Sequence, residues 1–230
     1  MTEHAPPPPP PPAPRNEDTP ALPDALRDAP MSQGMAVPYI TLAHRDRSDR
    51  PAWGNVDPIR LREVLERALC QICGTPLGEQ VILFILPSDF RQGLTVEPGL
   101  HPACAEYSAR ACPLLAGRMH RYHRHPAQRL TRCADPRCHC WGWVPPRPDP
   151  ARDGAPTEAW YELRLPLSEY RVITVPGTDN RPAVTGIDLK TPRLMHRIRK
   201  IRDAAQPSQR ERDPLAMLLV VGVLFAGTDQ

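Results

Sequence analysis

The sequence predicts an α+β fold, and the order of three features along the chain supports this prediction. A CxxCG turn occupies residues 70–74. An apolar run of strand length follows at 81–86, and the shorter stretch 94–96 can pair back against it as a hairpin. A helix then begins near residue 101, with an HxxC motif in its first turn. A cysteine turn, a hairpin and a helix with two further ligands form, in this order, a treble-clef metal-binding core.

The ligands of this core would be Cys70, Cys73, His101 and Cys104. Each CxxC or HxxC step places two donors on one side of a turn, and two such steps complete a tetrahedron. Gly74 can adopt the positive φ that closes the first turn, so that backbone N–H groups point at the thiolate sulfurs. Three thiolates and one imidazole fill every position, which predicts one structural Zn²⁺ ion. The alternative is that the two pairs are unrelated buried thiols and that His101 only starts a helix.

A second candidate metal site lies further along the chain and comprises Cys133, Cys138, His139 and Cys140. Adjacent ligands such as His139 and Cys140 are difficult to place on one tetrahedron, and the paired CxxC spacing is missing. The alternative is a reduced loop whose cysteines carry no metal. Cys112 is expected to be a core thiol rather than a ligand. The sequence therefore leaves open whether a second metal binds.

The composition indicates a reducing environment. The chain of 230 residues contains seven cysteines, an odd number with several at ligand spacing, which fits reduced thiols and metal better than a disulfide framework. No basic segment followed by an apolar one opens the sequence, so we expect a cytoplasmic protein. The apolar run 215–226 is shorter than the roughly 20 residues that cross a bilayer, so no integral membrane segment is expected.

Proline and glycine divide the chain into four parts. The unbroken proline run at 6–12 cannot bury apolar surface, so residues 1–37 are expected to form a disordered tail. Residues 38–132 are expected to form the treble-clef zinc domain, and 133–159 a connection rich in proline and glycine. Residues 160–230 are expected to add a strand pair, a basic helix and an apolar helix to the same core.

Several elements are predicted before the CxxCG turn and after the HxxC helix. Residues 36–43 fit a short strand, and a helix is expected to begin at Pro58 with Asp57 as its N-cap. Alternating apolar residues predict a half-buried strand at 161–167, with 170–175 as its partner.

Proline positions then constrain the second half of the chain. Pro166 would put the strand at 161–167 at the edge of a sheet. Thr191 and Pro192 are expected to open the basic helix, which carries an apolar stripe of Leu194, Ile198 and Ile201. Asp213 and Pro214 are expected to open the apolar helix near the end of the sequence.

The sequence argues against catalysis at the zinc site. Treble-clef nucleases of the HNH type need a histidine general base on the hairpin, and no histidine lies between Cys73 and His101. A zinc deaminase needs an HxE motif, and the glutamate that follows Cys104, Glu106, has the wrong offset from His101. A binding or adaptor module is therefore the main hypothesis. The alternative is a divergent metal-dependent nuclease, or a hydrolase that uses the cluster from Cys133 to Cys140.

Two classes of partner fit a binding module. The segment 118–132, which we call the basic segment, contains no acid, and Tyr122 within it could stack on a base. It carries five arginines that could contact phosphates: Arg118, Arg121, Arg124, Arg129 and Arg132. A solvated basic surface is the alternative. The other partner class is a second protein, bound through the surface of the zinc domain.

Residues 36–176 resemble a group of uncharacterised zinc-binding proteins of actinobacteria and actinophages. The motifs that carry the resemblance are CQICG, LHPACAEYSARACPLLAGRM, VPYIT and WYELRLPLSEYRVITVP. The resemblance implies that Cys70, Cys73, His101 and Cys104 are the ligands. Some members of the group carry an automatic label of cell envelope biogenesis or OmpA protein, which the sequence does not support. The resemblance implies no activity.

Overall fold

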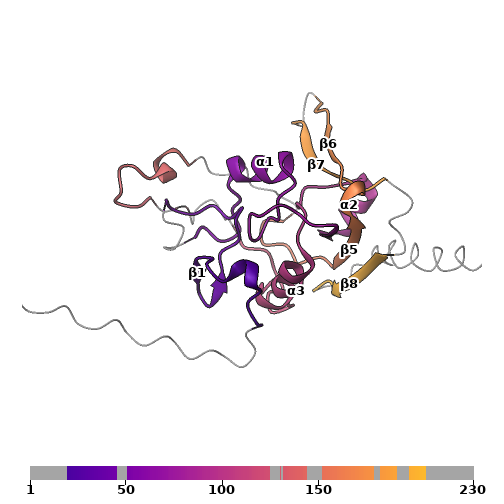
Figure 1. Cartoon of the computed structure of the whole chain (residues 1–230), viewed down its shortest axis with the longest axis horizontal. Coiled ribbons are helices and arrows are strands. Elements are labelled where there is room, and N and C mark those ends of the chain that lie inside the picture. Colours follow the sequence, from indigo (N-terminus) through magenta and orange to yellow (C-terminus); the bar gives the residue numbers. More distant parts are fainter. Residues whose placement is uncertain are drawn as a thin grey trace, which may run out of the picture.

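A computed structural model describes residues 20–45, 51–124, 130, 132–143, 152–178, 182–190 and 197–205. These residues form a mixed α/β structure with antiparallel sheets (Figure 1). The prediction of a mixed fold is therefore confirmed. The expected apolar helix after Pro214 lies outside the described residues.

One three-stranded sheet forms the centre of the fold. Its strands are β3 (Gln80–Ile85), β5 (Trp160–Pro166) and β8 (Ile198–Arg202), in the order β3-β5-β8. All pairs are antiparallel, and Leu83 lies opposite Leu163 in the register. Each of these two leucines is completely buried, so the middle of the sheet is also the middle of the hydrophobic core.

Two smaller sheets account for the other strands of the described residues. The first contains β4 (Leu94–Thr95), β7 (Val184–Asp188) and β6 (Val172–Val175), in the order β4-β7-β6. In Figure 1, β6 and β7 project away from the body of the protein. The second is the hairpin of β1 (Met31–Ser32) and β2 (Met35–Ala36) near the beginning of the described chain.

Three α-helices accompany the sheets in the described residues. They are α1 (Pro58–Glu66), α2 (Pro87–Gln92) and α3 (Pro102–Ala111), and each has proline in its first turn. Short 3-10 helices occur at η1 (Asp24–Leu26), η3 (His139–Gly142) and η4 (Leu167–Glu169). The helices predicted from Pro58 and near residue 101 are both confirmed.

The N-terminus of α1 shows how the local sequence sets its boundary. The Asp57 carboxylate accepts hydrogen bonds from the backbone N–H groups of Ile59 and Arg60, at 2.9 and 3.3 Å. These two N–H groups have no partner within the helix, so the carboxylate stabilises its first turn. The helix ends at Glu66, and Ala68 turns the chain toward Cys70 with a φ of 48°.

The predicted hairpin between 81–86 and 94–96 is wrong. Residues after β3 form α2 rather than a turn, because Pro87 starts a helix and the Asp89 carboxylate accepts from the backbone N–H of Leu86. The short helix carries β4 away from β3, and β4 pairs with β7. Leu100 returns instead to Ile82 and forms an antiparallel bridge with it.

The predicted edge strand at 161–167 is also corrected, because β5 lies in the centre of its sheet. Glu162, on the face expected to meet water, is 3 % exposed and accepts hydrogen bonds from Arg164 and Arg199, at 2.7 and 2.6 Å. The two guanidinium groups compensate a carboxylate that burial would otherwise destabilise. The segment 170–175, expected to pair with β5, contains β6, which pairs with β7 instead.

Two further expectations differ from the structure. Residues 198–202, expected to continue the basic helix, form strand β8, which pairs with β5 with a shift in register at Trp160. The described residues also include structure before residue 38, whereas residues 1–19 of the expected tail lie outside the described residues. Within 20–37, η1 and the β1–β2 hairpin are formed, and Leu26 is completely buried. The expected strand at 36–43 is reduced to the end of β2 and one bridge at Thr41.

Candidate metal centre

The structure brings together the four ligands predicted from the sequence, which we call the first cluster: Cys70, Cys73, His101 and Cys104. Their ligand atoms all lie within 4.8 Å of one another. Cys70 and Cys104 are completely buried, whereas Cys73 and His101 are partly exposed. The two buried cysteines belong to the main hydrophobic core, so the cluster joins the CxxCG turn to the interior of the fold.

Backbone hydrogen bonds shape the CxxCG turn. The N–H of Cys70 donates to Thr75 O and the N–H of Gly74 donates to Cys70 O, both at 2.8 Å. Gly74 has a φ of 76°, a left-handed conformation that glycine adopts without strain. The turn therefore folds back on itself and directs both cysteine side chains to the same side.

A neighbouring segment fixes this turn from outside. The N–H groups of Tyr39 and Ile40 donate to the carbonyls of Ile72 and Gln71, at 2.8 and 3.2 Å. Gln71 also donates from its side chain to Pro98 O at 2.6 Å. The turn is thus held between residues 39–40 and the chain that leads into α3.

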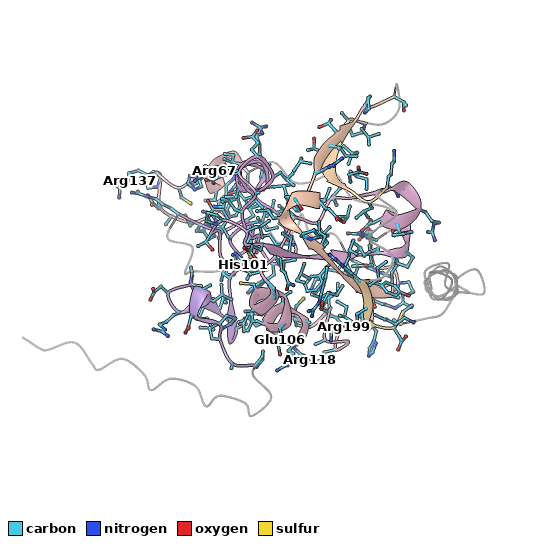
Figure 2. All side chains as sticks on the ribbon, turned by 45° about the vertical axis from the view of Figure 1, so that its right-hand side comes forward. Arg67, His101, Glu106, Arg118, Arg137 and Arg199 are labelled. Atoms are coloured by element: carbon cyan, nitrogen blue, oxygen red, sulfur yellow. The ribbon has the colours of Figure 1, made fainter. Side chains whose placement is uncertain are left out.

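The other two ligands come from the start of α3. His101 is the N-cap residue of this helix, and Cys104 follows one turn later. The bridge between Ile82 and Leu100 fixes the chain immediately before His101, with hydrogen bonds of 2.9 and 2.8 Å. Figure 2 labels His101 near the centre of the protein. Residues i and i+3 share one face of a helix, so both donors face the CxxCG turn.

The hydrogen bonds of His101 determine which ring nitrogen is free to bind metal. Its Nε2 lies 2.9 Å from Pro76 O, and a carbonyl can only accept, so Nε2 carries the proton. Its Nδ1 faces the cluster, 3.4 Å from Cys73 Sγ. Holding one nitrogen protonated on a carbonyl is the usual way to orient a histidine ligand.

Hydrogen bonds within the cluster favour thiolate at Cys70. Hydrogen bonds from the Cys104 and Cys73 side chains, aided by the backbone N–H groups of Cys73 and His101, lower the pKa of the Cys70 thiol to about 3, against the opposing effect of burial. The same contact with Cys70 raises the pKa of Cys104. The pair of Cys70 and Cys104 therefore loses one proton readily, and the resulting thiolate favours binding of a cation.

The donors of the first cluster fit Zn²⁺. Bond lengths of about 2.3 Å to sulfur and about 2.05 Å to nitrogen place these two donors about 3.5 Å apart in a tetrahedron. The distance of 3.4 Å between Cys73 Sγ and His101 Nδ1 agrees with this value. Thr75 Oγ1, 3.1 Å from Cys73 Sγ, is placed to donate to its thiolate. Residues and distances together suit a closed tetrahedral zinc site.

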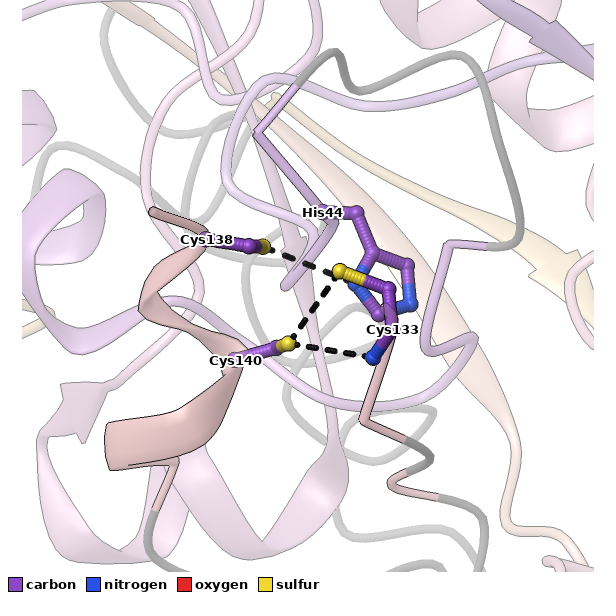
Figure 3. A group of neighbouring side chains, drawn as sticks. All are labelled: His44, Cys133, Cys138 and Cys140. Atoms are coloured by element: carbon purple, nitrogen blue, oxygen red, sulfur yellow. Dashed lines mark hydrogen bonds between the residues drawn. The ribbon is translucent and has the colours of Figure 1, made fainter. Parts of the chain in front are cut away.

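The second candidate site is only partly as the sequence suggested. Cys133, Cys138 and Cys140 come together, but His139 is exposed and is not a member. The fourth member is His44, from a distant part of the chain (Figure 3). Sequence reasoning missed His44 because it stands alone in a charged loop, with no second ligand at a recognisable spacing.

The described arginines of the basic segment contact the chain itself. Arg118 donates to the carbonyls of Arg110 and Ala111 at the end of α3, at 3.1 and 2.8 Å. Arg121 donates to Gly154 O at 3.0 Å, and Arg132 lies over the ring of Trp141, 5.4 Å from its centroid.

Two further arginines and Tyr122 belong to the basic segment. The side chain of Arg124 lies against Gly154, and Arg129 is outside the described residues. Tyr122, expected to stack on a base, has Arg152 5.5 Å from its ring centroid, so one face of the ring is already covered. In the described part of the segment, Arg118 and Arg121 thus support the fold through hydrogen bonds, while the arginines remain exposed to solvent.

No protein-family model, curated protein or solved structure matches the chain. Among the residues that the structure describes, no helix has the length and apolar character needed to span a bilayer.

Proposed function

We propose that this chain is a non-catalytic zinc protein of a reducing, cytoplasmic environment. One Zn²⁺ ion, bound by the first cluster, would hold a treble-clef-like unit of turn, returning strand and helix, and the folded unit would bind another protein. The observation that carries this proposal is the closed set of four donors, two of them completely buried. With four protein ligands, zinc has no position left for water or substrate.

The surroundings of the first cluster also support a structural role. Residues 74–100 contain no histidine that could act as a general base. The Asp89 carboxylate is occupied in the fold, where it accepts hydrogen bonds from Leu86 N and Thr95 Oγ1 at 3.0 and 3.1 Å. Binding of a structural zinc ion can contribute on the order of 10 kcal/mol to a small domain.

The β6–β7 hairpin supports a protein partner. Val172, Val175 and Val184 are 40, 41 and 38 % exposed. Val175 lies opposite Val184 in the register, so the two form an apolar pair on one face. Strand β6 stands at the edge of its sheet, and an apolar edge strand can pair with a strand of another protein. By contrast, the described arginines of the basic segment are used within the chain.

Metal analysis tests the zinc part of the proposal. Zinc should co-purify with the full chain, and Cys104→Ser should lose the zinc of the first cluster together with much of the thermal stability. A strong chelator should remove the zinc and lower the thermal stability of wild-type protein. A structural role would be contradicted if the zinc-free protein were as stable as the zinc-bound protein. Activity on nucleic acid that disappears on zinc removal while the fold persists would favour the nuclease alternative.

Partner capture tests the binding part. After cross-linking in the native host, the wild-type chain should be recovered together with a partner protein. The Val175→Glu variant should be recovered without this partner. Ile59→Glu is the matched control, because Ile59 is 78 % exposed on α1 and far from the hairpin in sequence. Binding to random-sequence RNA or DNA that weakens steeply between about 50 and 200 mM salt would instead indicate a nucleic-acid partner.

A further inference from the structure

We infer that His44, Cys133, Cys138 and Cys140, which we call the second cluster, form a second zinc site. This site would connect the segment 39–45 to the loop 132–143. It goes beyond the proposed function, which depends on the first cluster alone. The donor set is again three thiolates and one imidazole, which suits a closed structural site.

The geometry of the second cluster fits one tetrahedral ion (Figure 3). Its ligand atoms lie within 4.8 Å of one another. Cys138 Sγ is 3.7 Å from His44 Nδ1, and Cys133 Sγ is 3.5 Å from Cys140 Sγ. A tetrahedral zinc site places sulfur and nitrogen about 3.5 Å apart and two sulfurs about 3.8 Å apart. A disulfide would need a sulfur separation of about 2.0 Å, so the two cysteines are not bonded.

The main hydrophobic clusters do not account for the burial of these residues. His44, Cys138 and Cys140 are 5, 3 and 1 % exposed. The two cysteines nevertheless belong to neither hydrophobic cluster of the described chain. Loop 132–143 has little regular structure, with only η3 assigned within it. Donor atoms that bury one another in a loop with so little apolar packing are what a bound ion produces.

Backbone groups support the donors, as they do in the first cluster. The N–H of Cys133 donates to Cys140 Sγ at 3.3 Å. Cys138 Sγ accepts from the backbone N–H groups of Cys140 and Arg45. These bonds stabilise thiolate sulfur and fix its direction, as outer hydrogen bonds do in metal sites.

A turn at Asp135 shapes the loop around the cluster. Its side chain accepts from Arg137 N at 2.9 Å, and its carbonyl accepts from Cys138 N and Trp141 Nε1, at 3.1 and 3.2 Å. The ring of Trp143 lies 5.0 Å from that of His44 and covers it. The exposed His139 lies between two ligands of this turn, so the loop directs Cys138 and Cys140 inward and His139 to solvent.

Counting zinc in the full chain and its variants tests the second site. We expect wild-type protein to hold two zinc ions per chain, and His44→Ala and Cys140→Ser to hold one. His139→Ala is the matched control, because it removes an imidazole from the same loop and should leave two ions. His44→Cys should retain two ions, because it restores a fourth donor. Cys104→Ser should lose the ion of the first cluster, so failure at one site can be distinguished from failure at the other.

Titration with Co²⁺ in place of zinc gives a second readout, whose first arm uses wild-type protein alone. Wild-type protein should bind two Co²⁺ ions with the absorption of tetrahedral thiolate sites, and His44→Ala should lose half of this absorption. One metal ion in wild-type protein would overturn the inference, as would two ions that persist in His44→Ala. A disulfide between Cys133 and Cys140 in freshly purified protein, detected by mass spectrometry, would also overturn it.

Discussion

Gly74 lies directly against the ring of Tyr39. A Cβ atom added at Gly74 would stand 2.6 Å from Cδ2 of that ring, closer than real contacts allow. The backbone of Tyr39 is bonded to the same turn through Ile72 O. Close approach of these two residues therefore joins the first cluster to the chain segment that leads to His44.

Replacement of Gly74 should weaken the first cluster. Gly74→Ala forces both a strained φ of 76° and a clash with Tyr39, so we expect a loss of stability and a weaker hold on zinc. Gly117→Ala is the matched control, because Gly117 has the same φ and no atom within 4 Å of the added Cβ. Thermal melts should show that Gly74→Ala costs at least about 1 kcal/mol more than the control. Equal losses would mean that Tyr39 moves aside freely.

Nitrogen NMR of His101 should reveal its bonding directly. Since Nε2 donates to Pro76 O, we expect a proton on Nε2 and zinc on Nδ1. Long-range ¹H–¹⁵N spectra of labelled protein distinguish the two nitrogens. Zinc removal should shift Nδ1 more than Nε2, and a proton found on Nδ1 in the zinc-bound protein would contradict the assignment.

The metal-free protein should become more stable as pH rises from acid toward 9. Its Cys70 has a pKa of about 3 in the folded state, against an ordinary value of 9.0 in the unfolded chain. Between these values the folded state binds fewer protons at Cys70 than the unfolded state, so stability present above pH 9 is lost as pH falls. The raised pKa of Cys104 acts only above its ordinary value of 9.0, where it reverses the trend.

Urea melts of chelator-treated protein across this pH range measure the effect. Cys70→Ser should flatten the dependence, because it removes the titrating thiol. A dependence that is unchanged in this variant would assign the effect to another group.

Replacement of Glu162 should destabilise the central sheet. Glu162→Gln keeps the shape but removes the charge that compensates Arg164 and Arg199, so we expect a loss of about 1–3 kcal/mol. Glu106→Gln is the control, because Glu106 forms a comparable ion pair with Arg110 on the exposed face of α3. Denaturant melts should leave the control almost unchanged, and an equal loss in both variants would contradict the importance of burial.

Local signals in the sequence predicted what lies close together in the chain. Asp57 and Pro58 fixed the start of α1, and the HxxC motif at the start of α3 gave two ligands of the first cluster. These signals are strong because the physical cause, a capped helix or a pair of donors on one turn, lies within a few residues.

Pairings between distant segments were not predictable in this way. A continuous apolar run indicated the strand at 81–86 and alternation indicated the strand at 161–167, but neither pattern shows that the two strands pair with each other. Residues Ile198 and Ile201 have helical spacing, yet β8 forms because the edge of β5 offers hydrogen bonds to it. His44 was missed for the same reason, since its partners lie far along the chain.

We expect the segment between Tyr39 and His44 to couple zinc binding at the two clusters. Its first residues are bonded to the cysteine turn of one cluster, and its last supplies a ligand to the other. Zinc binding at the first cluster would hold the segment between Tyr39 and His44 in place. His44 would then already lie close to Cys138 when the second ion binds. Loading of the two ions would then be cooperative, with fewer half-filled molecules than two independent sites would give.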